Sequence, residues 1–363
     1  MKVLILANNS GGLYKFRKEL LEELLENRHE LFISLPNGDF IEELQQMGCE
    51  FIETGISRHG TNPLTDLVLA KKYHTIIKLV KPDIVFTYTI KPNVYGGIAC
   101  QLCKIPYIAN VTGLGTAVEN GGFLQKITLT LYKIGLRKAK RVFFQNQENQ
   151  DFMLNHKVLK CAYSLLPGSG VNLELFTPIP YPDETDGVHF VFISRIMREK
   201  GIEQYLDAAK HFTKTHPELH FHICGFCEPE YKGKLDDYIK NGTVIYHGMV
   251  RDVRKIHKIS HCTIHPSFYP EGISNVLLES CACARPIITT DRSGCREVVD
   301  DCVNGFVVKQ HDSEDLIQKI EKFLELKHEQ KMQMGLAGRT KVEREFDRRI
   351  VVDAYLKELE NLE

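Results

Sequence analysis

The sequence predicts an α/β protein with two doubly wound domains, each a parallel sheet covered by helices on both faces. Strand-like and helix-like segments alternate along almost the whole chain. The apolar runs are continuous rather than alternating, which is typical of parallel strands buried on both faces. The length of 363 residues exceeds the usual size of one hydrophobic core, so two domains are expected.

The first domain is predicted over residues 1–170. A strand at 3–7 leads into a small-residue loop at 8–12 and a helix at 14–26. Helical patterns separate most of the further strands of this domain, which are expected at 31–35, 51–54, 84–88, 107–110 and 142–146.

A stretch rich in proline and glycine follows and is predicted as a linker over 171–187. The alternation then restarts in a second domain, 188–347. The final amphipathic segment, 348–363, is predicted as a helix that closes the second domain or packs back on the first. The second domain is expected to have strands at 190–194, 220–224, 244–247, 263–266 and 287–290, and helices at 202–213 and 275–284.

Composition excludes several classes of protein. A net charge of −1 gives no overall attraction to nucleic acid. The N-terminal apolar run is too short for a signal peptide, and no window is long enough to span a membrane, so a cytoplasmic protein is expected. The pairs Cys100/Cys103 and Cys224/Cys227 lie far apart in the chain, which favours buried or incidental thiols over a zinc site.

The loops after the strands are where ligands are expected, because open α/β sheets bind them beyond the carboxyl ends of their strands. Two units joined by a hinge would leave an interdomain cleft at these loops. The first loop, N-N-S-G-G, does not match the dinucleotide fingerprint, and the chain has no P-loop. Gly12 in this loop would simply let a ligand approach the backbone closely.

The loop S-R-I-M-R-E-K-G carries two cations between a strand and a helix. Arg195 and Lys200 can converge on one point above the strand end, where the helix adds the positive end of its dipole. A diphosphate would find there a forked donor, a point charge and a helix N-terminus. The alternative is a pair of solvated cations.

The stretch E-G-I-S-N-V-L-L-E brackets a predicted helix start with two acids. Ser274 is expected to cap a helix beginning at Asn275, and free amides before it would form an anion site. Glu279 could accept hydrogen bonds from vicinal hydroxyls, and Glu271 could contact a sugar or stabilise positive charge. The alternative is plain helix capping. The amides of the predicted anion site belong to Gly272, Ile273 and Ser274.

These motifs, with S-G-C-R-E and N-G-F-V downstream, resemble the retaining glycosyltransferases of family 4, which have the GT-B fold. In the first half, R-H-G-T-N-P, Y-T-I-K-P-N-V-Y-G-G and N-V-T-G-L-G-T are similar to bacterial members that build capsule, O-antigen or other glycans on undecaprenyl diphosphate. The resemblance covers essentially the whole chain. It implies two Rossmann-like doubly wound domains with an interdomain cleft.

The resemblance implies a hexosyltransferase that needs no metal and no cofactor. The donor would be a nucleotide sugar, UDP-N-acetylhexosamine or a UDP-uronic acid, and its anomeric configuration would be retained. Arg195 and Lys200 would neutralise the departing diphosphate, Glu271 would contact the donor sugar and Glu279 the ribose. The nucleobase is expected against the loop G-M-V-R-D, at Met249 and Val250.

The acceptor is expected to be a polyprenyl-diphosphate-linked glycan held by the first domain. Relatives often carry a histidine near the donor sugar, and this chain has Thr112 and Gly113 in that loop, with His59 as a candidate substitute. Polar residues that would face the acceptor are Arg58, Asn62, Lys91 and Asn93.

Segment 123–141 mixes apolar and basic residues as a basic amphipathic helix does, which predicts peripheral contact with a membrane surface. An ordinary sheet-covering helix with a solvated basic end is the alternative. Two other functions stay open at this point: an enzyme like the UDP-sugar 2-epimerases, and a sugar-nucleotide-binding protein without turnover.

Overall fold

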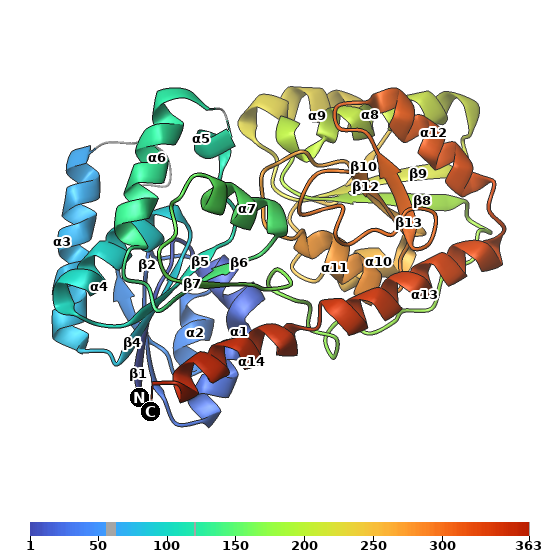
Figure 1. Ribbon diagram of the computed structural model, residues 1–363. Coiled ribbons are helices and arrows are strands. Elements are labelled where there is room, and N and C mark those ends of the chain that lie inside the picture. The colour runs from blue at the N-terminus through green and yellow to red at the C-terminus, as the bar shows by residue number, and fades with distance from the viewer. Residues whose placement is uncertain (56–62, 120, 363) are drawn as a thin grey trace. The chain divides into compact units, whose positions relative to one another are not determined.

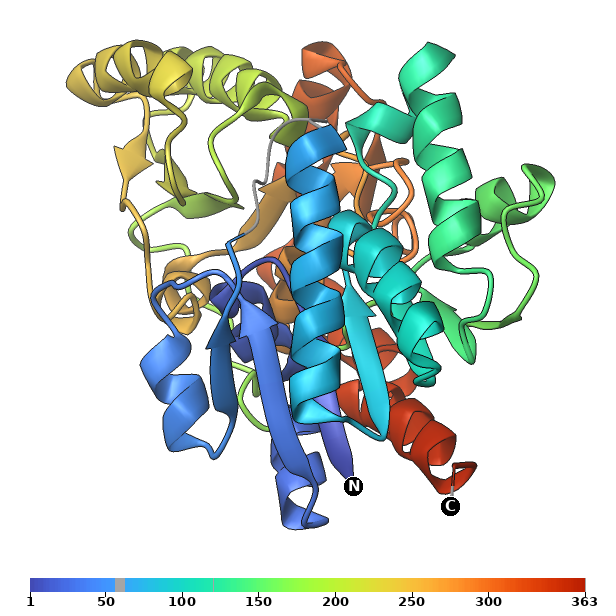
Figure 2. The ribbon, with the colours of Figure 1, turned by 90° about the vertical axis from the view of Figure 1, so that its left-hand side faces the viewer.

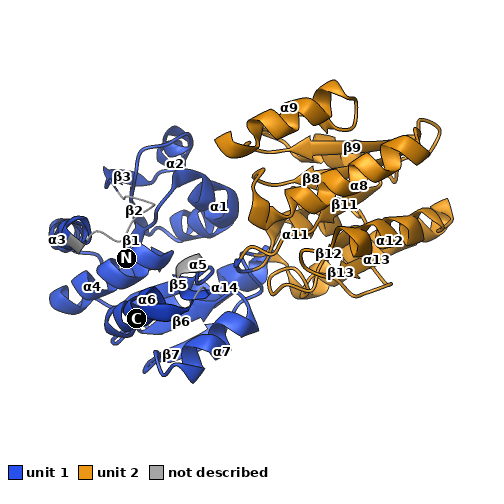
Figure 3. Cartoon of the chain, turned by 90° about the horizontal axis from the view of Figure 1, so that it is seen from above, with its two compact units in different colours: residues 1–169, 270–272, 348–363 blue, residues 170–269, 273–347 orange. Residues whose placement is uncertain are grey.

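The computed structural model describes residues 1–55, 63–119 and 121–362, which form two compact units. Unit 1 comprises Met1–Ser169, Pro270–Gly272 and Arg348–Glu363, and unit 2 comprises Gly170–Tyr269 and Ile273–Asp347 (Figure 3). Each unit has one sheet in which every neighbouring pair of strands is parallel. The predicted fold class, two doubly wound α/β units, is confirmed.

The sheet of unit 1 has seven strands in the order β3-β2-β1-β4-β5-β6-β7 (Figure 1). Its strands are β1 (Lys2–Leu6), β2 (Glu30–Leu35), β3 (Glu50–Glu53), β4 (Ile84–Tyr88), β5 (Tyr107–Val111), β6 (Arg141–Phe144) and β7 (Ala162–Leu165). Its helices are α1 (Ser10–Glu26), α2 (Ile41–Gln46), α3 (Pro63–Val80), the π-helical turn η1 (Pro92–Gly96), α4 (Gly97–Cys103), α5 (Thr116–Glu119), α6 (Gly122–Gly135), α7 (Gln147–Asn155) and α14 (Arg348–Glu360).

Two apolar cores cover the two faces of this sheet. On one face α3, α4 and α6 pack on the sheet, with Tyr73, Cys100 and Tyr132 buried beside Leu4 and Val85 (Figures 1 and 2). On the other face lie α1, α2 and α14. Continuous apolar strands such as Ile84–Tyr88 are therefore buried on both sides, as their sequence predicted.

The C-terminal helix α14 belongs to unit 1. The Arg348 guanidinium contacts the Glu19 carboxylate of α1 at 2.6 Å, and Arg141 of β6 donates to Glu358 at 2.5 Å. The Tyr355 ring packs against Phe86 in the core. The sequence left open whether this segment closes the second domain or packs back on the first, and the structure shows that it packs on the first.

The sheet of unit 2 has six strands in the order β10-β9-β8-β11-β12-β13. They are β8 (Val188–Ile193), β9 (Leu219–Cys224), β10 (Ile245–Tyr246), β11 (Cys262–His265), β12 (Ile287–Thr290) and β13 (Gly305–Val308). The helices are the 3-10 turns η2 (Arg198–Lys200) and η3 (Pro229–Tyr231), and α8 (Ile202–Thr215), α9 (Lys232–Lys240), α10 (Arg254–Ile259), α11 (Asn275–Ala282), α12 (Ser313–Leu324) and α13 (His328–Glu345).

Several element boundaries differ from the prediction. Strands β7 and β13, each four residues long, were not predicted. Helix α11 ends at Ala282, two residues early, because Ala284 has a left-handed backbone with φ of 56°. The predicted small-residue loop at 8–12 is wrong: α1 begins at Ser10, capped by the Asn9 side chain.

The predicted linker, 171–187, packs as a strap on unit 2. Arg285 is fully buried, and its guanidinium donates to the carbonyls of Ile179 and Pro180, each at 2.9 Å. Arg339 donates to Phe176 O at 2.6 Å. Burial lowers the pKa of Arg285 to about 10. A proline-rich composition therefore marks a segment held by the side chains of Arg285 and Arg339, and unit 2 begins at Gly170.

Candidate functional site

The two predicted cations of unit 2 lie against one aromatic ring. Arg195 follows β8 and is exposed, whereas Lys200 ends η2 and is only 7% exposed. The Lys200 ammonium is 4.7 Å from the centre of the Tyr269 ring, and the Arg195 guanidinium carbon is 5.6 Å from it. Arg195 also lies 3.7 Å from the Glu228 carboxylate. Both side chains therefore lie over the same ring, and their convergence on one diphosphate stays a prediction.

The loop that carries Tyr269 is interlocked with the loop that carries the cations. Phe268 N donates to Glu199 O at 2.9 Å, and Thr290 Oγ1 donates to Ser267 O at 2.5 Å. Gly201 has φ of 77° and packs so closely on Pro266 that a Cβ atom would lie 2.1 Å from its carbonyl oxygen. Backbone contacts therefore set where Tyr269 lies.

The start of α11 differs from the predicted anion site. Ser274 occupies the N-cap position, but its hydroxyl is 3.2 Å from His265 Nε2 and makes no cap to the helix backbone. Its N–H donates to Gly294 O at 2.8 Å and is not available to a ligand. The predicted side-chain cap and the free amide of Ser274 are therefore wrong.

The remaining donor residues predicted in unit 2 lie around this helix and after β10. Ile273 is buried in a small apolar core under α11, while Asn275 and Glu279 are half-buried on the first two turns. Met249 is 68% exposed, and Val250 packs against the apolar cluster around Ile193. The Gly225 N–H donates to Gly248 O at 2.8 Å and holds this loop to the end of β9.

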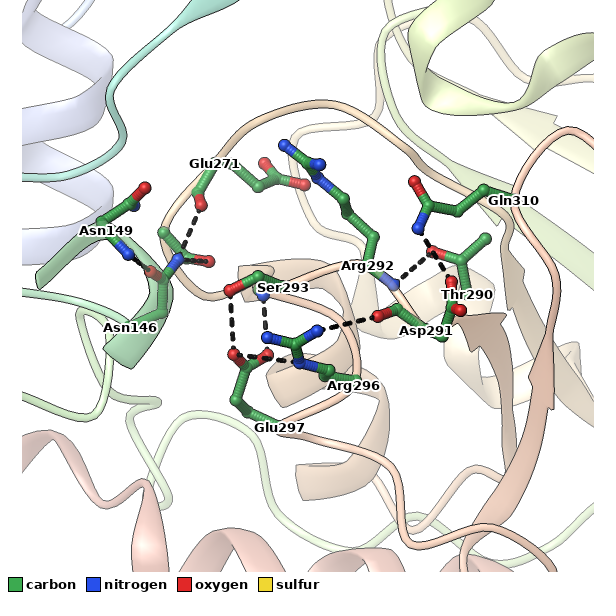
Figure 4. A network of polar contacts seen from close by, with 12 residues as sticks. Asn146, Asn149, Glu271, Thr290, Asp291, Arg292, Ser293, Arg296, Glu297 and Gln310 are labelled. Carbon is green, nitrogen blue, oxygen red and sulfur yellow. Dashed lines mark hydrogen bonds and ion pairs between the residues drawn. The ribbon is translucent and has the colours of Figure 1, made fainter. Parts of the chain in front are cut away.

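Glu271 and Gly272 belong to unit 1, although the chain enters and leaves them from unit 2. The Asn146 side-chain amide donates to Glu271 O at 2.9 Å and to Gly272 O at 3.2 Å (Figure 4). A Cβ atom on Gly113 would lie 3.2 Å from Pro270 O, and one on Gly272 would lie 2.9 Å from Thr112 O. Thus Thr112 and Gly113, predicted for the acceptor, lie against Glu271 and Gly272, predicted for the donor.

Asn146 is a residue that the sequence reasoning missed. It is 2% exposed and caps α7, with its Oδ1 accepting from Asn149 N at 2.8 Å. The signal was available, because an asparagine directly after a buried strand and before a helix is a capping pattern. The same side chain fixes the Glu271 backbone, so one residue performs both tasks.

The motif S-G-C-R-E folds into a loop stabilised by its own glutamate (Figure 4). The Glu297 carboxylate accepts from Ser293 Oγ at 3.0 Å and from Gly294 N at 2.6 Å. This turn presents the Gly294 carbonyl that holds Ser274. Burial lowers the pKa of the neighbouring Arg292, whose backbone N–H donates to Thr290 Oγ1 at 3.4 Å.

The other predicted residues of unit 1 divide into three groups. Gly12 lies in the first turn of α1, where its N–H donates to Asn9 Oδ1 at 2.5 Å, so a ligand at this amide would displace Asn9. Lys91 is paired with Asp66 at 2.9 Å beside a cavity of about 360 Å³ lined by α3. Predicted residues that lie outside the described part of the chain are Arg58, His59 and Asn62.

Asn93 does not face an acceptor. Its side chain is fully buried, accepts from Thr87 Oγ1 at 2.6 Å and donates to Asn110 O at 2.7 Å. Both ends of the amide are therefore used inside unit 1, and the predicted contact with the acceptor is wrong. A buried polar group must be satisfied, which explains an asparagine at this position.

Helix α6 is shorter than the predicted basic helix over 123–141. It ends at Gly135, and Arg141 lies in β6 instead, paired with Glu358. Within the helix, Thr128 and Tyr132 face the sheet. Apolar side chains are left exposed on it at Phe123 (79%), Leu124 (41%), Ile127 (39%) and Ile134 (49%). Leu129, Leu131 and Tyr132 pack against the core, so α6 covers the sheet and also exposes apolar side chains. Among the residues described, no helix has the length and apolarity needed to span a bilayer.

Two family models match the chain, one in each half. The model described as "Glycosyl transferases group 1" matches residues 181–341, and "Glycosyl transferase 4-like" matches residues 2–146. The first match contains both cations and the E-G-I-S-N-V-L-L-E motif.

Curated relatives match at low identity. An N,N'-diacetylbacillosaminyl-diphospho-undecaprenol alpha-1,3-N-acetylgalactosaminyltransferase of Campylobacter jejuni is 26% identical, with 98% of each chain covered. A UDP-Gal:alpha-D-GlcNAc-diphosphoundecaprenol alpha-1,3-galactosyltransferase of Escherichia coli is 25% identical over 68% of this chain and 67% of that protein. Among solved structures, Anabaena HepE in complex with UDP superimposes with a TM-score of 0.80 at 17% identity, covering 99% of this chain and 100% of that one.

Proposed function

Because this chain belongs to the glycosyltransferases whose two family models match its halves, we propose that it transfers a sugar from a UDP-sugar to a polyprenyl-diphosphate-linked glycan. The donor would be a UDP-N-acetylhexosamine or a UDP-uronic acid, and the product a surface polysaccharide. The observation that carries the proposal is the convergence of Arg195 and Lys200 on Tyr269 at the end of β8. The Campylobacter relative, named for transfer to a diphospho-undecaprenol acceptor, supports the acceptor class.

The proposed chemistry uses charges of the protein at the leaving group. As the bond between the sugar and the diphosphate breaks, negative charge grows on the diphosphate oxygens. Arg195 would offer a fork of N–H donors and Lys200 a point charge, both already in place. In other enzymes a metal ion often neutralises this charge. Because Arg195 and Lys200 would supply the positive charge here, we propose transfer without a metal. Glu279 would accept from the ribose hydroxyls.

The proposed stereochemistry is retention of the anomeric configuration. Glu271 would contact the donor sugar, its backbone held by Asn146. The leaving phosphate oxygen would take the proton of the acceptor hydroxyl on the same face of the sugar, so no protein base is assigned.

Membrane contact is proposed for one surface of unit 1. Helices α3 and α6 begin at the same end of the sheet, as helices of parallel α/β units do (Figure 1). Near these ends α3 exposes Leu64, Leu67 and Val68, and α6 exposes Phe123, Leu124 and Ile127. Lys126 and Lys133 lie on α6 among its apolar side chains. Apolar residues with interspersed lysines suit the cytoplasmic face of an anionic membrane.

The test of the transfer is UDP release measured against a panel of UDP- and GDP-sugars. Each donor is tested with and without polyprenyl-diphosphate-linked glycans, and with a metal chelator. Release that requires both one donor and the acceptor is expected, at the same rate in chelator. UDP binding without any release would contradict transfer, and loss of activity in chelator that Mg²⁺ restores would contradict independence of metal. The anomeric configuration of the product, read by NMR, tests retention.

Glu271→Gln separates binding from transfer. The variant should bind UDP as the parent does and lose about a hundredfold in turnover, if the carboxylate supports the transition state. Arg195→Ala should instead weaken UDP binding. Unchanged turnover in the first variant, or unchanged UDP affinity in the second, would remove that residue from the site.

Vesicle co-sedimentation tests the membrane surface. Replacing Phe123 and Ile127 by serine should reduce binding to anionic vesicles. Leu79→Ser is the control, because Leu79 (77%) is as exposed as Phe123 (79%) and lies at the far end of α3. Equal losses in both variants would argue against a defined surface.

A further inference from the structure

Tyr269 is shared by the two cations that the proposed function assigns to the donor diphosphate. The ring centre lies 4.7 Å from the Lys200 ammonium and 5.6 Å from the Arg195 guanidinium carbon. Both distances are within the range at which a cation is attracted to an aromatic face. One ring therefore faces two positive groups that repel each other.

The burial of Lys200 makes this ring contact important. The residue is only 7% exposed, and an ammonium taken out of water loses most of its hydration. The face of a tyrosine ring compensates for part of the lost hydration energy, and it carries no negative charge that would compete with an incoming diphosphate. The ring thus contributes to stabilising the buried cation without neutralising it.

Arg195 has a competing partner. Its guanidinium lies 3.7 Å from the carboxylate of Glu228, and both side chains are partly exposed, at 47% and 31%. An exposed pair at this separation is weak. Without the ring, the repulsion from Lys200 would move Arg195 toward Glu228 and away from the point of convergence.

The ring is placed by backbone contacts. Phe268 N donates to Glu199 O, and Ser267 O accepts from Thr290 Oγ1. Glu199 and Lys200 belong to the same short helix, so the ring and the ammonium are positioned by one connected piece of backbone. A geometry that exists before the ligand arrives reduces the cost of binding it.

We propose that Tyr269 is a positioning residue: its ring holds Arg195 and Lys200 together so that both contact one diphosphate. The inference rests on the proposed function and adds a residue to it. The diphosphate of the donor, and inorganic pyrophosphate as its simplest analogue, are the ligands whose binding depends on the ring. Uridine, which has no phosphate, should not depend on it.

Binding by calorimetry tests this with three variants. Tyr269→Leu should weaken UDP and pyrophosphate binding about five- to tenfold, the effect expected from loss of a partly buried cation–π contact. Tyr269→Phe keeps the ring face and should bind within about twofold of the parent. Phe268→Leu is the matched control: it changes the neighbouring ring, which contacts His311 at 3.8 Å, and should leave the affinity unchanged.

A fluorescent variant gives a direct readout. The chain contains no tryptophan, so Tyr269→Trp would introduce a single one at the ring position. Its emission should change on addition of UDP or pyrophosphate and stay constant on addition of uridine. Its UDP affinity should match or exceed that of the parent, because indole binds cations best.

Each outcome decides between the two proposals. Equal UDP affinity in Tyr269→Leu and the parent, or tighter binding in Tyr269→Leu, would overturn the role of Tyr269. Equal losses in Tyr269→Leu and Phe268→Leu would assign the effect to loop structure and overturn it as well. If the parent binds neither UDP nor pyrophosphate, the proposed function itself fails.

Discussion

The two units have the same architecture but bury different kinds of polar group in their sheets. In unit 1 a network of amides and hydroxyls joins β4, β5 and α14. Thr87 donates to Asn93, Asn93 to Asn110 O, and Tyr88 to the Tyr355 hydroxyl at 2.9 Å, while Tyr355 donates to Asn110 Oδ1. Burial raises the pKa of both tyrosines, so these groups stay uncharged across the physiological range.

In unit 2 a row of imidazoles crosses β8 and β9 and reaches the end of β10. His189 Nδ1 is 2.8 Å from His222 Nε2, and His222 Nδ1 is 2.9 Å from His247 Nε2. His189 also stacks on His220 and His261, whose rings contact carbonyls of the strap, Asp186 O and Asp183 O. In each imidazole pair one nitrogen donates and the other accepts, which requires neutral rings at one or both positions.

This difference predicts which unit responds to acid. Burial, followed by the neighbouring imidazoles, lowers the pKa of His222 to about 3, and burial lowers that of His261 to about 4 and that of His257 to about 3. Four histidines are buried in the described structure, His222, His257, His261 and His265, and all belong to unit 2. Two units with similar folds can thus differ in pH sensitivity, because the fold does not dictate which polar side chains are buried in each sheet.

The largest expected effect comes from Arg285 in unit 2. Arg285→Ala removes the donor to the carbonyls of Ile179, Pro180 and His257 and should destabilise the unit by about 3–5 kcal/mol. Thermal unfolding with hydrogen exchange resolved on peptides would place the loss in unit 2 and the strap. Arg344→Ala, at an exposed arginine, is the control and should leave stability unchanged. A loss of equal size in both variants, or one seen only in unit 1, would contradict this.

Asn93→Ala should have the next largest effect and should act on unit 1. It leaves the Thr87 hydroxyl and the Asn110 carbonyl without their partner, at a cost of about 2–3 kcal/mol. Chemical denaturation measures the loss, which should be the same at pH 7 and pH 5. The KM for the acceptor should not change, since the side chain is buried. A changed KM with unchanged stability would restore the acceptor role.

Acidification should destabilise unit 2, with a smaller effect for each buried histidine than for the Arg285 and Asn93 substitutions. The folded pKa values of these histidines lie below the unfolded value of about 6.5. Their stabilising contribution is therefore complete above pH 6.5 and is lost as the pH falls toward 3. At pH 5 a histidine shifted to about 3 contributes up to about 2 kcal/mol of this loss.

Hydrogen exchange at pH 7 and pH 5 compares the two units directly. Relative to the intrinsic exchange rate at each pH, peptides of β8 and β9 are expected to lose more protection between pH 7 and pH 5 than those of β4 and β5. His222→Gln should flatten the dependence on pH while retaining hydrogen-bonding groups. An equal loss of protection in both units would refute the comparison.

Met249→Ala should have the smallest effect on stability. The side chain is 68% exposed, so the unfolding midpoint should not move. If Met249 contacts the nucleobase, the variant should bind UDP a few-fold more weakly and pyrophosphate unchanged. Loss of pyrophosphate binding would show instead that the variant disturbs the loop after β10.

Several features could be predicted from sequence because they depend on local patterns. Continuous apolar runs predicted the buried parallel strands, and the short connector between Arg195 and Lys200 agrees with their shared contact with the Tyr269 ring. The motifs predicted the glycosyltransferase class that the family models match. The start of α1 was not predicted, because the small residues of N-N-S-G-G are typical of a loop, whereas Asn9 caps a helix that begins at Ser10.

Other features were decided by tertiary structure alone. Asn93 looked like a surface contact until the network with Thr87 and Asn110 showed it to be a buried link, and Ser274 gave its N–H to Gly294 rather than to a ligand. Tyr269 had no motif of its own and gained its place from contacts between two loops. The sequence determines which hydrogen-bonding groups each residue carries. The partners of these groups depend on segments that come into contact only when the chain folds.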